Sequence, residues 1–255
     1  MCVIIYVKKG EEINQAELKA AWRRNPDGAG YAIRKDGKIL FHRGFMTFEE
    51  YRKVINKLNK KFDLMIHVRI TTSNEVNKLQ THPYAIEDVT QLGGESQMVI
   101  SMNGSVRGQK LKEGFNDTMS FIEEHRYLFV AMLKQKEENE FKDYGDIITR
   151  FSGAKWCIMT KDFTYTSPQF IEENNILFSN IFHRKYLEMQ NNIKINNIMK
   201  NEKLLSTIKK DIKLLNKINN FVYNKCSRYY CTKCTKCLYK ANTLRDVKIT
   251  LKENQ

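Results

Sequence analysis

The chain opens with Met1-Cys2-Val3-Ile4-Ile5-Tyr6-Val7. Residues 3–7 are apolar and mostly β-branched, which predicts a short strand buried in a sheet. Cys2 then lies at the start of that strand, where the end of a sheet leaves room for a pocket. An initiator methionine is removed most readily when the next side chain is small. We therefore expect the mature protein to begin at Cys2.

An N-terminal Cys2 would carry a free α-amino group beside its own thiol. The amine has an ordinary pKa of about 7.7–8.0 and the thiol one of about 8.5, so near neutral pH some of the amine is unprotonated. It could take the thiol proton directly or through one water, which would place nucleophile and general base on a single residue. The alternative for Cys2 is a small buried hydrophobic residue without chemistry.

Five short motifs follow Cys2 within about the first 120 residues. They are Asn25-Pro26-Asp27-Gly28-Ala29-Gly30, His67-Val68-Arg69-Ile70-Thr71-Thr72, Thr81-His82-Pro83, Met102-Asn103-Gly104 and Asn116-Asp117-Thr118. In this order they resemble the glutaminase domain of the class II glutamine amidotransferases, a family of N-terminal-nucleophile (Ntn) hydrolases. The resemblance implies an α+β fold, a four-layer α-β-β-α sandwich of two antiparallel sheets with helices outside.

The resemblance also implies an activity. A chain of this family hydrolyses the side-chain amide of glutamine through a thioester on Cys2 and supplies the ammonia to an acceptor. We find no P-loop, no G-x-G-x-x-G and no S-G-G-x-D-S motif in the sequence. A separate synthetase that activates the acceptor is therefore the expected partner, with a simple amidase as the other option.

Two groups of residues suit thioester chemistry. Asn103 and Gly104 end an apolar strand, where an amide side chain and a backbone N–H can converge on a developing oxyanion. Arg69 lies within an apolar strand, although arginine is rarely buried without a partner, and its planar fork fits a carboxylate. A solvent-exposed arginine on an edge strand is the alternative.

The resemblance assigns further substrate contacts. It places the glutamine α-carboxylate on Arg69 and the α-ammonium on Asp117, and it adds Thr72 and His82 to the substrate-binding set. An ordinary helix N-cap also accounts for residues 116–118, and a structural hydrogen-bonding role also accounts for His82, as it does for His67.

The sequence departs from the family pattern at three positions. Met102 replaces the histidine of H-N-G, Ile70 replaces an aromatic residue, and Ser73 replaces a histidine. None of the three removes a group needed for the thioester, but together they bear on how glutamine fits the pocket.

Composition limits the broad class of protein. A chain of 255 residues with 42% hydrophobic content can bury one full core and a smaller appendage. We find no apolar run of about 18 residues, so no transmembrane helix is expected. The N-terminus lacks the basic and cleavable regions of a signal peptide. Together with a free nucleophilic thiol, this predicts a cytoplasmic protein.

Three segments are expected: a glutaminase domain over residues 2–182, a basic amphipathic helical segment over 183–225, and a Cys-rich tail over 226–255. In the first segment, Asn14 is expected to cap a helix at Gln15–Arg24. The capping box Thr47-x-x-Glu50 is expected to open a second helix at 48–60. Another helix is expected to start at Thr118. Strands are expected at 63–70, 97–102 and 156–159, and a hairpin at 172–180.

The last 73 residues are strongly basic. Residues 183–255 hold 17 Lys and Arg against 5 Asp and Glu, a net charge of +12 out of +14 for the whole chain. Apolar residues at 3/4 spacing predict an amphipathic helix over 200–222. Docking on its own domain is the plain interpretation of the apolar stripe; a dimer contact, with Asn219 setting the register, is the alternative.

Four cysteines are clustered in the tail: Cys226, Cys231, Cys234 and Cys237. In a reducing compartment such a cluster predicts metal binding rather than disulfides. Four thiolates suit a closed, structural zinc site. Iron–sulfur ligation and the absence of any metal stay open as alternatives.

The tail also supports a different function. Basic residues interleaved with tyrosines suit phosphates and stacked bases, so a nucleic-acid-binding protein with an inert Ntn-like domain is the alternative to the enzyme. Retention of Cys2, Arg69, Asn103 and Asp117 in one chain favours the enzyme.

Overall fold

A computed structural model describes residues 1–71, 76–106, 108–185, 187–188 and 213. All of these residues except 213 belong to one compact unit, Met1–Ile193. Its elements in chain order are β1 (Val3–Val7), α1 (Gln15–Arg24), β2 (Ala29–Lys35), β3 (Lys38–Phe45), α2 (Phe48–Leu58), β4 (Asp63–Val68), the 3-10 helix η1 (Lys78–Gln80), β5 (Tyr84–Ala85), β6 (Gly93–Ser96), β7 (Met98–Asn103), α3 (Asp117–Glu124), α4 (Arg126–Leu133), α5 (Glu138–Ser152), β8 (Lys155–Thr160), β9 (Thr164–Thr166), β10 (Ile171–Glu173) and β11 (Ile176–Phe178).

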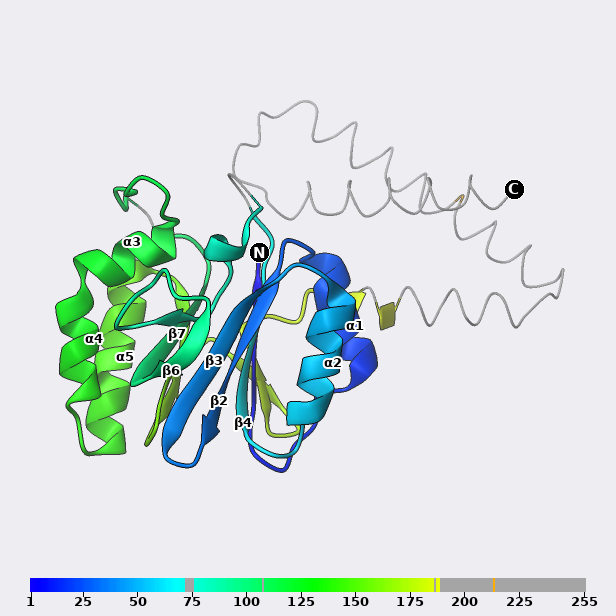
Figure 1. Cartoon of the computed structure of the whole chain (residues 1–255), viewed down its shortest axis with the longest axis horizontal. Helices are drawn as coiled ribbons and strands as arrows, with labels where there is room; N and C mark the ends of the chain where they lie inside the picture. The colour runs from blue at the N-terminus through cyan, green and yellow to red at the C-terminus, as the bar shows by residue number, and fades with distance from the viewer. Residues whose placement is uncertain (72–75, 107, 186, 189–212, 214–255) are drawn as a thin grey trace, which may run out of the picture. The chain divides into compact units, whose positions relative to one another are not determined.

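The described strands form two antiparallel sheets. One has seven strands in the order β10-β11-β1-β4-β2-β3-β6, and the other has four in the order β5-β7-β8-β9. Helices α1 and α2 cover the outer face of the first sheet, and α3, α4 and α5 cover the outer face of the second (Figure 1). The mixed α+β arrangement with antiparallel sheets is therefore confirmed. The basic helix and the metal knuckle expected beyond it lie outside the described residues.

Strand β1 is buried on both faces, as its unbroken apolar run predicts. Val3, Ile5 and Val7 pack under α1 and α2, whereas Ile4 and Tyr6 point into the layer between the sheets. Alternation along a strand has period two. Cys2 therefore belongs to the same face as Ile4, the face that looks toward the second sheet.

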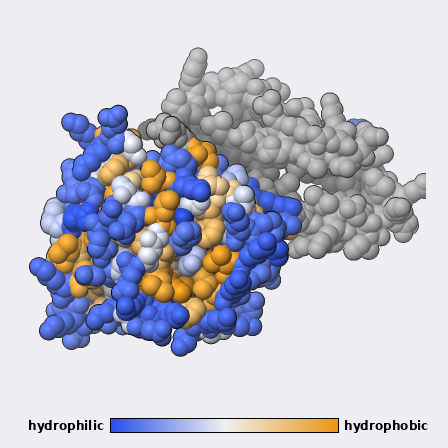
Figure 2. All heavy atoms as spheres, viewed as in Figure 1, coloured by the Kyte–Doolittle hydropathy of each residue, from blue (hydrophilic) through white to orange (hydrophobic). Residues whose placement is uncertain are grey.

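Strand β7 shows the same alternation in the second sheet. Met98, Ile100 and Met102 pack against the helices α3 to α5, and Val99 faces the first sheet. Residues 101 and 103 lie on the same face of β7 as Val99. Asn103 therefore points into the layer between the sheets. Seen along the layers, apolar residues gather over the strands in the middle of the molecule, and the outer helices are mainly hydrophilic (Figure 2).

The first expected helix is confirmed to the residue. α1 spans Gln15–Arg24, and the side chain of Asn14 accepts a hydrogen bond from the backbone N–H of Ala16. The helix ends where Asn25 precedes a proline, a position that disfavours helical backbone.

The second expected helix is shorter than predicted. α2 ends at Leu58 instead of residue 60, because the side chain of Asn59 exchanges hydrogen bonds with the backbone of Ile13 and draws the chain away. Its capping box is also incomplete: the hydroxyl of Thr47 donates to the Glu50 carboxylate and does not cap a backbone N–H.

The expected strands are confirmed with small changes at their ends. β4 stops at Val68, beyond which the backbone of Arg69 bonds to two successive residues, Asp27 and Gly28, instead of one; β7 runs one residue further than expected, to Asn103. β8 contains the expected strand at 156–159, and α3 starts at Asp117, one residue earlier than expected. The hairpin expected at 172–180 is present as β10 and β11.

Two glycines of the 25–30 motif let a distant loop approach β2. A Cβ on Gly30 would lie 2.2 Å from the carbonyl oxygen of His82 and 2.8 Å from the Cα of Arg43. A Cβ on Gly28, which has a φ of +113°, would lie 2.6 Å from the side chain of Thr81. The glycines therefore seat the Thr81-His82 segment directly on the sheet.

Replacing Gly30 by alanine should push that segment away. We expect Gly30→Ala to lower the free energy of unfolding by about 3 kcal/mol, since backbone atoms block the added methyl group. Gly94→Ala is the matched control: its φ is +138°, but no described atom lies within 4 Å of the added Cβ. Its cost should be only about 1–2 kcal/mol, the backbone strain of a positive φ without a steric clash. Urea unfolding of both variants measures the difference, and equal losses would contradict the close-approach argument.

Candidate active site

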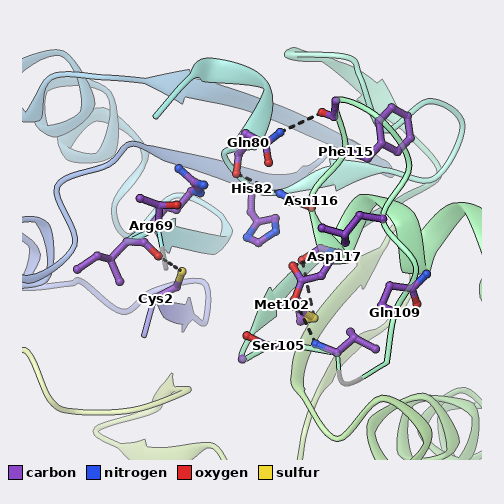
Figure 3. Close-up of a pocket in the computed structure, with 17 residues that line it drawn as sticks. Cys2, Arg69, Gln80, His82, Met102, Ser105, Gln109, Phe115, Asn116 and Asp117 are labelled. Atoms are coloured by element: carbon purple, nitrogen blue, oxygen red, sulfur yellow. Dashed lines mark hydrogen bonds between the residues drawn. The ribbon is translucent and has the colours of Figure 1, made fainter. Parts of the chain in front are cut away.

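A cavity of about 490 Å³ lies at the end of the sandwich where β1 begins. It is bordered by both sheets, by the start of α3 and by the loop after β7. Figure 3 shows Cys2 and Arg69 on one side, Met102, Ser105 and Asp117 on the other, and His82 between them. The residues that line it are Cys2, Arg69, Ile70, Thr71, Gln80, His82, Met102, Gly104, Ser105, Val106, Gln109, Leu111, Gly114, Phe115, Asn116, Asp117 and Thr118.

The pairing of β1 with β4 positions the thiol. Val3 lies opposite Val68 in this antiparallel pair, so the residue before β1 meets the residues after β4. The thiol of Cys2 accordingly donates to the backbone oxygen of Ile70 over 3.5 Å. Burial raises the pKa of the Cys2 thiol, a shift that the nearby Arg69 partly offsets. With Met1 attached, the thiol is therefore mainly protonated at neutral pH.

Arg69 is the unusual arginine that its sequence context predicted. It is 8% exposed, and its Nη1 is buried with no hydrogen-bond partner among the described residues. Its backbone is fixed to the 25–30 motif: its N–H donates to Gly28 and its oxygen accepts from Asp27. A buried, unpaired guanidinium N–H is costly. A bound anion would pair this N–H group. The alternative of a solvent-exposed arginine on an edge strand is wrong, because the Arg69 side chain is buried.

The N-cap interpretation of residues 116–118 is confirmed. The side chain of Asn116 accepts from the N–H of Met119, and its Nδ2 donates to the hydroxyl of Tyr84. Asp117 follows as the first residue of α3, and its carboxylate accepts from the N–H of Val106 over 3.1 Å. That contact holds the loop after β7 against the helix, and Asp117 still borders the cavity.

Arg43 fixes the loop that carries His82. This arginine is 1% exposed, and its guanidinium donates to the backbone oxygens of Leu79, Thr81, Val89 and Gln91, each at 2.7–2.8 Å. The guanidinium also lies over the ring of Tyr84, 4.6 Å from its centroid. Backbone dipoles thus take the place of a carboxylate partner, and they tie both ends of the 79–91 segment to β3.

His67 and His82 form a buried pair. Nε2 of His67 lies 3.2 Å from the oxygen of Met102 and 2.8 Å from Nδ1 of His82. Because a carbonyl oxygen only accepts, this geometry suits a proton on Nε2 of His67. Nδ1 of His82 then accepts, and Nε2 of His82 carries the ring proton. That atom is buried without a partner among the described residues, in a side chain that lines the cavity.

Both histidines are held neutral. Burial lowers the pKa of His67 to about 3, and Arg69 adds to the shift. Burial is the main cause that lowers the pKa of His82 well below its usual value, and the neighbouring His67, Arg69 and Arg43 add to it by opposing a positive charge on His82. A neutral His82 supplies a hydrogen-bond donor to the cavity without a second positive charge beside Arg69.

The two expected oxyanion donors lie at the end of β7. Gly104 lines the cavity and has a φ of +135°. Asn103 is 3% exposed, with its amide nitrogen 2.8 Å from the hydroxyl of Ser179 and its amide oxygen buried without a described partner. Alternation places Asn103 in the layer that Cys2 also faces.

Sequence reasoning missed two residues that contact this machinery. Ser179 touches Asn103, and the Nδ2 of Asn180 donates to the backbone oxygen of Cys2 over 2.7 Å. Both directly follow β11, which pairs with β1. The expected hairpin at 172–180 includes both residues. A strand pattern, however, does not predict which distant side chains the residues after the strand will contact.

The structure thus brings together most of the expected site. Cys2, Arg69, His82, Gly104 and Asp117 border one cavity, and the departures Ile70 and Met102 border it too. Asn103 is buried between two residues that line the cavity, Met102 and Gly104, but it is not itself among the lining residues. Thr72, Ser73 and the cysteines 226, 231, 234 and 237 lie outside the described residues, so the zinc site and the nucleic-acid alternative stay predictions. Within the described part of the chain, no group of three His, Cys, Asp or Glu side chains is placed to hold a metal.

Solved structures similar to this one include a glutamine phosphoribosylpyrophosphate (PRPP) amidotransferase from B. subtilis complexed with ADP and GMP. It shares 15% sequence identity, with a TM-score of 0.42 over 72% of this chain and 43% of that one. A second, described as the allosteric regulatory enzyme of purine biosynthesis, shows the same identity and coverage with a TM-score of 0.43. The chain thus spans less than half the length of these proteins.

The first of these two proteins is named as a glutamine amidotransferase. No protein-family model matches the sequence, and no curated protein matches it. The chemistry of the site rests on the residues of this chain. In the described residues, the helices are too short or too polar to cross a membrane.

The neutral state of His67 predicts how stability depends on pH. Its folded pKa is depressed from 6.5 to about 3, so as pH falls below 6.5 the unfolded chain takes up a proton that the folded chain refuses. The contribution of neutral His67 to the free energy of unfolding is complete above pH 6.5. It falls by about 1.4 kcal/mol per pH unit between pH 6.5 and about pH 3.

In His67→Gln, the unfolding free energy should therefore decline less steeply between pH 6.5 and 4.5 than in the wild type. Glutamine keeps a donor for the Met102 oxygen, so the comparison isolates the titration. Urea unfolding at pH 7.5, 5.5 and 4.5 measures both slopes. Parallel slopes would contradict the burial of a neutral His67.

Proposed function

We propose that this protein is a glutamine amidohydrolase that uses Cys2 as its nucleophile. One observation carries the proposal: a single cavity is bordered by a thiol, a buried guanidinium with an unpaired N–H, and a carboxylate at a helix start. Arg69 suits the α-carboxylate of an amino acid and Asp117 its α-ammonium. Arg69 follows β4 of the first sheet, and Asp117 begins α3, which packs on the second sheet. A zwitterion bound between the two would share the cavity with the Cys2 thiol.

The proposed reaction needs Cys2 to be N-terminal. Burial raises the pKa of its thiol, so a base must take the proton, and removal of Met1 would supply the α-amine of Cys2 itself. The sulfur attacks the side-chain amide carbon, and the carbonyl oxygen becomes an oxyanion stabilised by Asn103 and the N–H of Gly104. The carbon–nitrogen bond then breaks, and ammonia leaves with the proton from the amine.

Water completes the cycle. It attacks the thioester carbon, gives a proton to the amine, and releases glutamate as the sulfur leaves and regains its proton. Neutral His82 would donate a hydrogen bond to a substrate oxygen, and the Asn180 side chain would hold the Cys2 backbone in place.

We further propose that the ammonia passes to a separate synthetase, and that the basic, Cys-rich tail is held by one zinc ion and docks an acidic partner.

Replacing the nucleophile tests the proposal directly. Cys2→Ala should abolish glutamate and ammonia release, and Cys2→Ser should retain a trace because oxygen is the poorer nucleophile. Cys157→Ala is the matched control, since Cys157 is fully buried between the sheets and burial raises the pKa of its thiol.

Intact mass spectrometry of the active protein should show loss of Met1, and a glutamine-analogue electrophile should label Cys2. Retained Met1 in an active preparation, or labelling of Cys157, would overturn the mechanism.

Kinetics should separate substrate clamping from transition-state stabilisation. Arg69→Lys keeps the charge but loses the planar fork, so KM should rise more than kcat falls. Asn103→Ala should lower kcat by about 10²- to 10³-fold with KM little changed. Steady-state assays over a range of glutamine concentrations distinguish the two. An effect of Asn103→Ala on KM alone would refute its assignment to the oxyanion.

A further inference from the structure

Ser179 lies at a junction of the two sheets and is fully buried. Its N–H donates to the oxygen of Ile4, and its hydroxyl oxygen accepts from the N–H of Ile4 at 2.9 Å. Its backbone oxygen accepts from the ammonium of Lys155 over 2.6 Å. Three fixed contacts therefore hold this serine, so its hydroxyl is a rigid partner for Asn103.

The hydrogen bonds of this group do not balance with the amide as placed. The amide nitrogen of Asn103 donates to the Ser179 hydroxyl, which already accepts from Ile4. Among the described residues, this leaves the hydroxyl proton without an acceptor and the amide oxygen of Asn103 without a donor. Two complementary groups are thus both unsatisfied, which buried polar groups rarely are.

A half-turn of the amide corrects the imbalance. Oxygen and nitrogen of an asparagine amide have nearly the same shape, and their assignment follows from the surrounding donors and acceptors. With the oxygen toward Ser179, the hydroxyl proton has an acceptor at 2.8 Å and the hydroxyl still accepts from Ile4. The NH₂ group of Asn103 then points away from Ser179, into the position that the unpaired oxygen held.

We propose that Ser179 is a positioning residue: its hydroxyl donates to the amide oxygen of Asn103 and so presents the NH₂ group as the oxyanion donor. The inference deepens the proposed function and rests on it for its catalytic meaning. In the opposite orientation Asn103 would present an oxygen, which repels a developing oxyanion. The serine therefore decides whether this asparagine assists or opposes the reaction.

The orientation can be measured without any activity. Neutron diffraction from crystals of the whole protein exchanged into D₂O locates the two deuterons of the amide. We expect them on the side away from Ser179, with the hydroxyl deuteron directed at the amide oxygen. Deuterons between Asn103 and Ser179 would overturn the proposal, whether or not the protein hydrolyses glutamine.

Kinetics test the consequence. Ser179→Ala should lower kcat by about 10- to 100-fold with KM changed less than about 2-fold, while iodoacetamide alkylates Cys2 at the wild-type rate. Adding Ser179→Ala to Asn103→Ala should cause no further loss of kcat, since the asparagine is already absent. Equal losses in both backgrounds would show a merely structural serine and overturn the proposal.

Ser101→Ala is the matched control. Ser101 is also fully buried on β7, on the same face as Asn103, and its hydroxyl has no partner among the described residues. Its replacement should leave kcat unchanged, whereas Ser179→Thr, which keeps a hydroxyl, should restore most of the activity. Wild-type protein that releases no ammonia from glutamine would instead defeat the proposed function, and the neutron result would still decide the orientation of Asn103.

Discussion

The antiparallel pairing of β1 with β4 is the constraint on which the site depends. β1 lies inside the seven-stranded sheet, between β4 and β11. A slip of one residue would exchange the two buried faces of β1 and disrupt the packing of the apolar core on both sides of the sheet. The register is therefore strongly specified, and it carries Cys2 to Ile70 and Arg69 on one side and to Ser179 and Asn180 on the other.

Two buried arginines show how the fold separates support from chemistry. Arg43 donates to five backbone oxygens, four of them at 2.7–2.8 Å, which makes it the anchor of the His82 loop. Arg69 has a similar burial but leaves Nη1 unpaired within the described residues. The hydrogen bonds of Arg43 compensate for the burial of its charge and stabilise a loop. Arg69 needs a bound anion to pair its remaining N–H group. The unpaired nitrogens of Arg69 and His82 both belong to residues that line the cavity, which marks it as a place for a polar ligand.

Local patterns predicted the elements well. The apolar run of residues 3–7, the Asn14 cap and the Asn116 cap each depend on neighbours in the chain, and each is found as expected. The end of α2 was misplaced, because Asn59 bonds to Ile13, 46 residues away. The resemblance of five ordered motifs indicated most residues of the cavity, but it supplied neither the role of Arg43 nor the contacts of Ser179.

By itself, the sequence determined which segments form strands and helices, which face of each is apolar, and which unusual polar residues lie in apolar surroundings. These follow from periodicity and capping, which act over a few residues. Only the tertiary structure decided that Cys2, Arg69 and Asp117 border one cavity, that Gly30 makes room for His82, and that Ser179 meets Asn103. Those contacts join residues far apart in the chain, and they arise from sheet register and layer packing, which short-range patterns do not encode.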